Sequence, residues 1–246
     1  MATHAHLLAP LIRKLSQRSP LGAPETEALL GLPFRVRMVE RGTYLVRDGD
    51  KADHCTLLLS GFAYRSKIAG NGARQILSVH LRGDLLDLQN SLLERSDHNV
   101  QALTRVDVAS IPHRALLDVA GKYQKVALAL WRDTLIDASI FREWILNVGQ
   151  RNARQRIAHL FCELALRQEA AGLCDGPSYM WPMTQEQIGD ATGLTSVHVN
   201  RTLQGMRRDG LIHTGNQSVV IADWRGLQAA GDFSSRYLHG DAALAA

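Results

Sequence analysis

The sequence predicts an α+β fold with three parts in chain order: an antiparallel β-roll, a long helix and a winged helix-turn-helix. Three observations lead to this prediction. Short alternating stretches with turn residues between them fill residues 34–112, and a stretch with almost no Gly or Pro covers residues 115–169. Two capped helical segments around a glycine then occupy residues 183–212.

The composition is that of an ordinary globular chain, with 46% apolar and 21% charged residues among 246. No apolar run is long enough to span a membrane, and residues 1–18 lack a signal-peptide pattern, so we expect a cytoplasmic protein without a membrane partner. The three cysteines, Cys55, Cys162 and Cys174, are too scattered for a disulfide framework or a metal site. We therefore expect no metal and no cofactor.

The charge is unevenly distributed. The net charge is +4, yet residues 151–246 contain nine Arg, no Lys and nine acidic residues, which leaves that part neutral. Because net charge gives this part no attraction for an anionic partner, any nucleic-acid contact there must depend on the local placement of its arginines.

The N-terminal residues 1–33 are expected to contain two short helices, at 6–16 and 24–30. The period then changes to two, which indicates strands that alternate between a buried and an exposed face. Turn residues separate these strands, and we place a β-roll sensor domain at residues 34–114. The predicted strands span residues 34–39, 43–47, 54–60, 62–68, 74–81, 100–104 and 106–111.

Residues 115–149 are predicted to form one long helix with apolar residues on two sides. One register contains Leu128, Trp131, Leu135, Ala138, Arg142 and Ile145, and the other contains Ala127, Trp131, Thr134, Ala138, Phe141, Ile145 and Val148. One side can pack on the roll, whereas the other needs a partner. The predicted partner is a second copy, with an interface at Trp131, Ala138, Phe141, Ile145 and Val148. The alternative is a core helix buried within a single chain.

A helix-turn-helix is predicted within residues 150–226. Thr184 and Gln187 form a capping box, Gly193 supplies a positive φ for the turn, and Thr195 caps the second helix. Its buried stripe consists of Val199, Leu203 and Met206. Because its outer face is polar, the pair is typical of a DNA-binding unit. The alternative is a helical hairpin inside an enzyme.

The segments around this motif are weaker predictions. Polar residues at 150–153 indicate a hinge, and a further helix is expected at 156–166. We expect a loop at 172–179, and a β-hairpin at 211–221 of the kind called a wing. Residues 227–246 are expected to be a polar tail.

Several stretches resemble one family. Residues 184–203 are similar to the helix-turn-helix signature of the Crp/Fnr family of bacterial transcriptional regulators. Residues 79–85, 100–112 and 151–158 are also similar to that family, in the style of its Fnr-like branch. The resemblance implies a cyclic-nucleotide-binding-like jelly roll and a homodimer that binds a two-fold-symmetric operator in double-stranded DNA. It also implies a regulator without enzymatic activity that has RNA polymerase as a further partner.

The resemblance also implies DNA contacts. The second helix, Ser196–Arg208, would enter the major groove, with Arg201 at the family's base-reading position. Thr184 and Gln185 match positions that touch phosphate. Val197 stands where many relatives carry a Glu, so it can touch a thymine methyl group but cannot accept a hydrogen bond. The polar residues that can read or position DNA are Ser196, His198 and Asn200.

The sensor part departs from the family's best-known ligand sites. Cyclic-nucleotide receptors carry Gly-Glu and Arg-Ser pairs where this chain has Asp87-Leu88 and Ser96-Asp97, so we do not expect cyclic AMP to bind. Residues 1–54 contain no cysteine, and Fe–S clusters usually take four thiolates, so we do not expect a cluster either. The effector is unknown. A redox role for Cys55, or a haem or metal bound by His54, His80 and His98, has little support.

Two alternatives from other functional classes stay open. One is a cupin-like enzyme that binds a small molecule in the roll, although no His/Glu metal cluster or nucleophile–base pair supports it. The other is a protein-interaction module that has lost DNA binding, which the neutral charge of residues 151–246 favours.

Overall fold

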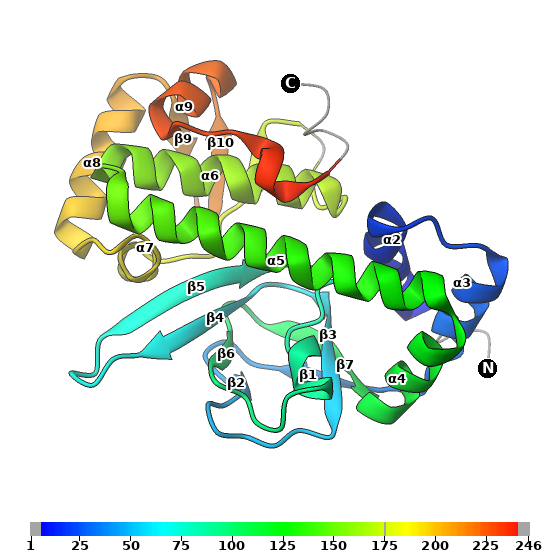
Figure 1. The fold of residues 1–246 in the computed structure, drawn as a ribbon. Coiled ribbons are helices and arrows are strands. Elements are labelled where there is room, and N and C mark those ends of the chain that lie inside the picture. The colour runs from blue at the N-terminus through cyan, green and yellow to red at the C-terminus, as the bar shows by residue number, and fades with distance from the viewer. Residues whose placement is uncertain (1–5, 175, 241–246) are drawn as a thin grey trace. The chain divides into compact units, whose positions relative to one another are not determined.

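The computed structural model describes residues 6–174 and 176–240, and Figure 1 shows the chain. The chain divides into two compact units. The first comprises Met1–Ser66 and Val79–Ala138, and the second comprises Lys67–Ser78 and Ser139–Ala246. No helix of the described residues is both long and apolar enough to cross a lipid bilayer.

The β-roll contains all seven predicted strands, with ends within two residues of the prediction. These are β1 (Arg35–Val39), β2 (Tyr44–Val46), β3 (His54–Ser60), β4 (Ala63–Ile68), β5 (Arg74–His80), β6 (Asn99–Ala102) and β7 (Val106–Pro112). They form two sheets with strand orders β1-β7-β3 and β2-β6-β4-β5. Leu58 and Val108 from the first sheet and Val100 from the second are fully buried in one apolar cluster, so the roll has its core between the sheets.

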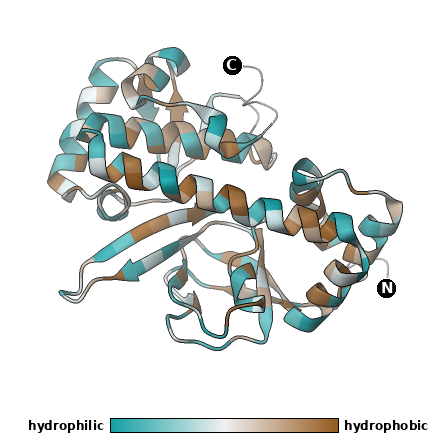
Figure 2. Cartoon of the chain, viewed as in Figure 1, coloured by the Kyte–Doolittle hydropathy of each residue, from teal (hydrophilic) through white to brown (hydrophobic). Residues whose placement is uncertain are grey.

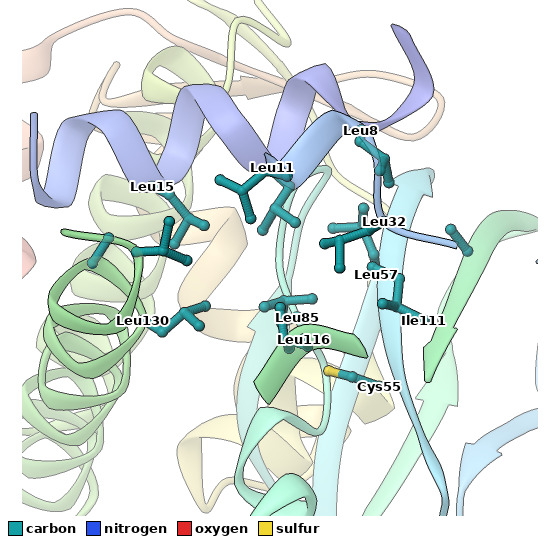
Figure 3. Packing of buried hydrophobic residues seen from close by; sticks show 14 of the residues in the cluster. Leu8, Leu11, Leu15, Leu32, Cys55, Leu57, Leu85, Ile111, Leu116 and Leu130 are labelled. Carbon is teal, nitrogen blue, oxygen red and sulfur yellow. The ribbon is translucent and has the colours of Figure 1, made fainter. Parts of the chain in front are cut away.

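The N-terminal helices cover the roll. They are η1 (His6–Leu8), α2 (Ala9–Arg18) and α3 (Ala23–Leu30). Figure 3 shows Leu8, Leu11 and Leu15 in one apolar cluster with Leu57 and Ile111 of the roll, and each of these side chains is at most 1% exposed. The predicted helices at 6–16 and 24–30 are therefore part of the core of the first unit.

Lys14 connects α2 to two other segments of the first unit. Its Nζ lies 3.0 Å from Asp84 Oδ1 and 2.8 Å from Asp133 Oδ2. Arg18 Nε adds a contact of 3.3 Å to Asp133 Oδ1. Because these groups are largely shielded from water, the ion pairs fix α2 more firmly than exposed pairs would.

The stretch predicted as one helix from residue 115 is two helices, α4 (His113–Lys122) and α5 (Gln124–Gln150), so this prediction was wrong. Tyr123 between them is extended, with φ −119° and ψ 97°. Its carbonyl accepts a hydrogen bond from Val126 N–H at 2.9 Å, so it begins the second helix while ending the first. The segment 150–153, where a hinge is predicted, contains a helix break, because α5 ends at Gln150 and Asn152 caps α6 (Ala153–Ala170).

The second unit surrounds α6. Its other helices include α7 (Gln185–Thr192) and α8 (Ser196–Arg208), and its sheet has the order β8-β10-β9. The strands are β8 (Ser178–Met180), β9 (Ile212–Thr214) and β10 (Ser218–Ile221). The wing hairpin is confirmed as β9 and β10. The loop expected at residues 172–179 was partly wrong, because β8 pairs with β10 at the edge of this sheet.

The segment after the wing is folded. The prediction of a polar tail at residues 227–246 was therefore wrong up to residue 240, and residues 241–246 lie outside the described part. Asp223 caps α9 (Trp224–Gly231) by accepting from Gly226 N–H. In η3 (Ser235–Leu238), Tyr237 donates through its hydroxyl to Glu163 Oε2 at 2.8 Å. Glu163 on α6 is fully buried, and this burial raises its pKa. The C-terminal segment thus supplies a partner to an otherwise costly buried carboxyl group.

The buried His159 predicts a pH-dependent stability. Burial, and after it the charge of Arg151, lowers its pKa to about 3. In the unfolded chain a histidine takes up its proton near a pKa of about 6.5. Between these two values the unfolded chain binds more protons than the folded protein, so stability falls as the pH falls. For one proton the loss reaches at most about 1.4 kcal/mol per pH unit.

We therefore expect His159→Gln to reduce the loss of unfolding free energy between about pH 6.5 and about pH 4.5, measured by urea denaturation. His213→Gln is the matched control, since His213 is exposed. An acid sensitivity of His159→Gln equal to that of the wild type would contradict the assignment.

Candidate nucleic-acid interface

The first helix of the motif begins at the predicted residue. Thr184 Oγ1 accepts from Gln187 N–H at 3.2 Å, and Gln187 Oε1 accepts from Thr184 N–H at 2.9 Å. This reciprocal pair is the capping box that the sequence predicts. Thr184 and Gln185 are exposed at the N-terminus of α7, where unbonded N–H groups and the helix dipole favour an anion.

Two glycines fix the connection between the two helices. Gly193 adopts a left-handed φ of 67°, as predicted. A second constraint, at Gly189, was not predicted from the sequence. A Cβ atom built on Gly189 would lie 2.4 Å from the carbonyl oxygen of Leu194. The two helices can therefore approach this closely only with glycine at position 189.

The second helix, α8, has one buried and one exposed face. Thr195 caps it by accepting from His198 N–H at 3.3 Å. The predicted inner stripe of Val199, Leu203 and Met206 is confirmed, since these side chains are at most 6% exposed. On the outer face Ser196, Val197 and Arg201 are exposed, while His198 and Asn200 are half-buried. The buried stripe thus holds the predicted reading residues outward.

Arg201 is an exposed cation on this face. It forms no hydrogen bond or ion pair with any other described residue. Arg207, further along α8, donates instead to Thr214 Oγ1 at 2.7 Å, which connects α8 to the wing. Gln204 Nε2 donates to Asn200 Oδ1 at 2.9 Å, so part of the hydrogen-bonding capacity of these two amides is already used. The guanidinium of Arg201 can accordingly make two parallel hydrogen bonds to a base edge.

Two arginines from other segments of the second unit bond to residues of α7. Arg156 on α6 donates to Thr192 O at 2.9 Å, at the C-terminal end of α7. Arg74, within the hairpin segment that belongs to the second unit, places Nη2 2.6 Å from Asp190 Oδ2. The sequence did not predict the second contact, because the two residues are far apart in the chain and neither belongs to a recognisable motif.

In the roll, residues 87–88 and 96–97 stand where cyclic-nucleotide receptors carry their nucleotide-binding residues. The polar side chains at these positions form hydrogen bonds within the roll. Asp87 accepts from Thr56 N–H at 2.7 Å and from Thr56 Oγ1 at 3.2 Å. Ser96 Oγ donates to His98 O at 2.9 Å, and Asp97 Oδ1 lies 2.8 Å from His98 Nδ1. Burial raises the pKa of Asp87. These side chains thus stabilise the roll itself, and Leu88 next to them offers no polar group.

The structure adds no support for a redox role of Cys55 or for a metal bound by histidines of the roll. Cys55 is fully buried, and burial followed by the charge of Asp87 raises its pKa well above the ordinary value. A thiol in such a site is a poor nucleophile and redox sensor. Within residues 6–174 and 176–240, no group of three His, Cys, Asp or Glu side chains is placed to hold a metal ion. His54 lies beside Asp53, and His98 beside Asp97.

Helix α5 has an exposed apolar face, and Figure 2 shows hydrophobic residues recurring along it. Trp131 is 64% exposed and Ile145 is 68% exposed, whereas Ile140 and Trp144 on the other side are buried. Among the other predicted interface residues, Ala138, Phe141 and Val148 are half-buried. Two apolar faces on one helix are thus present, as the sequence predicts.

Comparison with known proteins finds a matching domain family for each of two parts of the chain. Residues 155–230 match the family described as the Crp-like helix-turn-helix domain, and residues 36–123 match the cyclic nucleotide-binding domain. A nucleotide-binding-like roll followed by this motif defines a DNA-binding transcription regulator with a sensor domain. The chain belongs to the Crp/Fnr family.

Individual relatives agree with this placement. The chain is 29% identical over 203 residues to the transcriptional activator protein FnrL of Cereibacter sphaeroides, covering 80% of this chain and 81% of that protein. It is 28% identical over 207 residues to the anaerobic regulatory protein of Haemophilus influenzae, covering 84% and 80%. The solved structure of FixK2 from Bradyrhizobium japonicum has the same fold, with a TM-score of 0.74 at 23% identity, over 81% of this chain and 98% of that chain.

The turn gives a direct test. Gly189→Ala should lower the unfolding free energy by roughly 1–3 kcal/mol, because the added methyl group meets the backbone of Leu194. Gly205→Ala in α8 is the matched control. Nothing lies within 4 Å of its added Cβ, so this variant should be neutral or more stable. Urea unfolding checks both, and equal effects would show that the turn is not the constraint.

Proposed function

We propose that the protein is a homodimer that binds a two-fold-symmetric operator, with α8 of each copy in the major groove of one half-site. The observation that carries this proposal is the outer face of α8. The guanidinium of Arg201 is exposed there and has no partner among the described residues, while the opposite face of the helix is anchored in the core. A helix held in this way can present its side chains to base edges.

The side chains have different roles in this proposal. Arg201 reads a guanine through two hydrogen bonds, which gives roughly 1–3 kcal/mol of discrimination. Val197, 78% exposed, touches a thymine methyl group. Thr184 and Gln185 hold a phosphate at the N-terminus of α7. The half-site should therefore differ, at the base pair next to Val197, from sites that are read by an acceptor side chain.

The half-buried and smaller polar side chains complete the interface. Ser196 is exposed in the first turn of α8, where it can position the helix on a phosphate or a base edge. His198 can donate to a phosphate or a base. Asn200 already accepts from Gln204, and its own amide N–H groups are free to donate.

The dimer in this proposal forms along α5. The predicted interface residues Trp131, Ala138, Phe141, Ile145 and Val148 lie on this helix, and the most exposed of them cover the side opposite Ile140 and Trp144. An exposed apolar face of this length is costly in water and is typical of a helix that pairs with a second copy. Pairing two copies places two reading helices one helical turn, ~34 Å, apart.

Regulation in this proposal passes from the roll to the reading helix. The signal is neither cyclic AMP nor an iron–sulfur cluster. Support comes from Asp87, whose carboxyl group is bonded to Thr56, and from Leu88, which has no polar group for a ribose. Residues 150–153 act as the hinge, and RNA polymerase is the further partner of the DNA-bound dimer.

A second candidate function is an interaction module that keeps the fold without binding DNA. The neutral charge of residues 151–246 favours it. A salt series separates the two functions. A DNA-binding dimer loses affinity steeply as salt rises, because each phosphate contact releases counterions, whereas a module without phosphate contacts does not.

Arg201→Ala should remove sequence-specific retardation of the operator, while weak and salt-sensitive binding to any DNA persists. The dimer should stay intact in size-exclusion chromatography. Arg82→Ala, which removes one exposed arginine from the roll, is the matched control and should bind as the wild type does. Specific binding that survives Arg201→Ala would refute the assignment of α8.

Ile145→Asp should convert the dimer into a monomer, because the substitution would bury an unpaired carboxylate in the helix pair. Analytical ultracentrifugation measures the change. Ile145→Leu keeps the apolar volume, so it should remain dimeric. If Ile145→Asp sediments as a dimer, the two copies meet elsewhere.

A further inference from the structure

The roll contains a cleft that the proposed function does not use. Its volume is about 940 Å³, and all its lining residues belong to the first unit. The lining residues are Pro33, Phe34, Arg35, Val36, Arg37, Tyr44, Leu45, Asp53, His54, Ser110 and Pro112. Pockets that bind small molecules have volumes of roughly 300–1,000 Å³, so the cleft is large enough for one. Residues 84–98, which include the positions of the family's cyclic-nucleotide ligands, contribute nothing to this lining.

Strand register places the cleft at the open end of the space between the two sheets. Arg35 lies opposite Ser110 and Arg37 opposite Val108 in the pairing of β1 with β7. Directly opposite residues project to the same face of a sheet. Val108 is fully buried in the cluster between the sheets, so both arginines project toward that space. Tyr44, on β2, comes from the other sheet.

The charge of the cleft is cationic. Arg35 and Arg37 are exposed, and neither has a hydrogen bond or an ion pair with another residue in the described ranges. Asp53 is the one carboxylate in the lining, and it already lies 2.8 Å from His54 Nδ1. The guanidinium of Arg47 covers one face of the Tyr44 ring, 4.1 Å from its centre. Two unpaired guanidinium groups next to each other are a strong site for a carboxylate.

The remaining lining fits an apolar body. Pro33 and Pro112 supply rigid apolar surface, and Leu45 is half-buried in the lining.

The geometry points to a binding site for a small aromatic carboxylate in this cleft, with Arg35 and Arg37 holding the carboxylate and Tyr44 contacting the ring. The site lies within the roll but apart from residues 84–98. It is independent of what α8 recognises, since every lining residue is in the first unit.

Naphthalene-acetate and its uncharged isostere naphthalene-acetamide test the proposal on the full-length protein, by isothermal titration calorimetry. The acid should bind, and the amide should bind at least about tenfold more weakly, because only the acid forms charge-assisted hydrogen bonds. Arg35→Ala/Arg37→Ala should weaken binding of the acid by about tenfold or more. Arg82→Ala/Arg105→Ala is the matched control, because it removes two exposed arginines of the roll from outside the cleft.

Equal binding of acid and amide to the wild type would overturn the proposal without reference to any variant. Undiminished binding of the acid to Arg35→Ala/Arg37→Ala, with its thermal melting unchanged, would also overturn it. A third outcome is that an acidic peptide binds in an Arg35- and Arg37-dependent way while naphthalene-acetate does not. That result would replace the small molecule with a protein partner on β1.

Discussion

The close approach of α7 and α8 is the constraint on which the reading face depends. The carbonyl oxygen of Leu194 occupies the space that a side chain at Gly189 would need, and Gly193 turns the chain with a left-handed φ. With the turn fixed, Val199 and Leu203 can enter the core, and this burial sets the rotation of α8 about its axis. The direction in which Arg201 projects follows from that rotation.

Electrostatics must therefore act locally around α8. The neutral charge balance of residues 151–246 cannot attract DNA over a long distance, and several arginines of the second unit have structural partners within that unit. Arg156 bonds to Thr192, Arg207 bonds to Thr214, and Arg74 pairs with Asp190. These contacts position the two helices, while Arg201 has no such partner within the part of the chain that the structure describes. This difference in roles explains how the neutral segment 151–246 can present a cationic reading residue.

The features that sequence predicts well are local ones. The Thr184–Gln187 capping box involves residues three apart, and the inner stripe of α8 follows from helical periodicity. The missed features depend on distant partners. β8 forms only because β10 pairs with it, and the C-terminal segment folds because Tyr237 reaches the buried Glu163. The break at Tyr123 interrupts an apolar spacing that continues on both sides, so periodicity could not show it.

Selection of bound sequences from a pool of randomised DNA duplexes tests the central claim most directly. The proposed dimer should enrich a two-fold-symmetric site whose half-sites are separated by one helical turn, about 10 base pairs. Each half-site should contain a guanine read by Arg201 and, next to Val197, a thymine. Enrichment of no common sequence, or of a single asymmetric site, would contradict a symmetric dimer that reads DNA through α8.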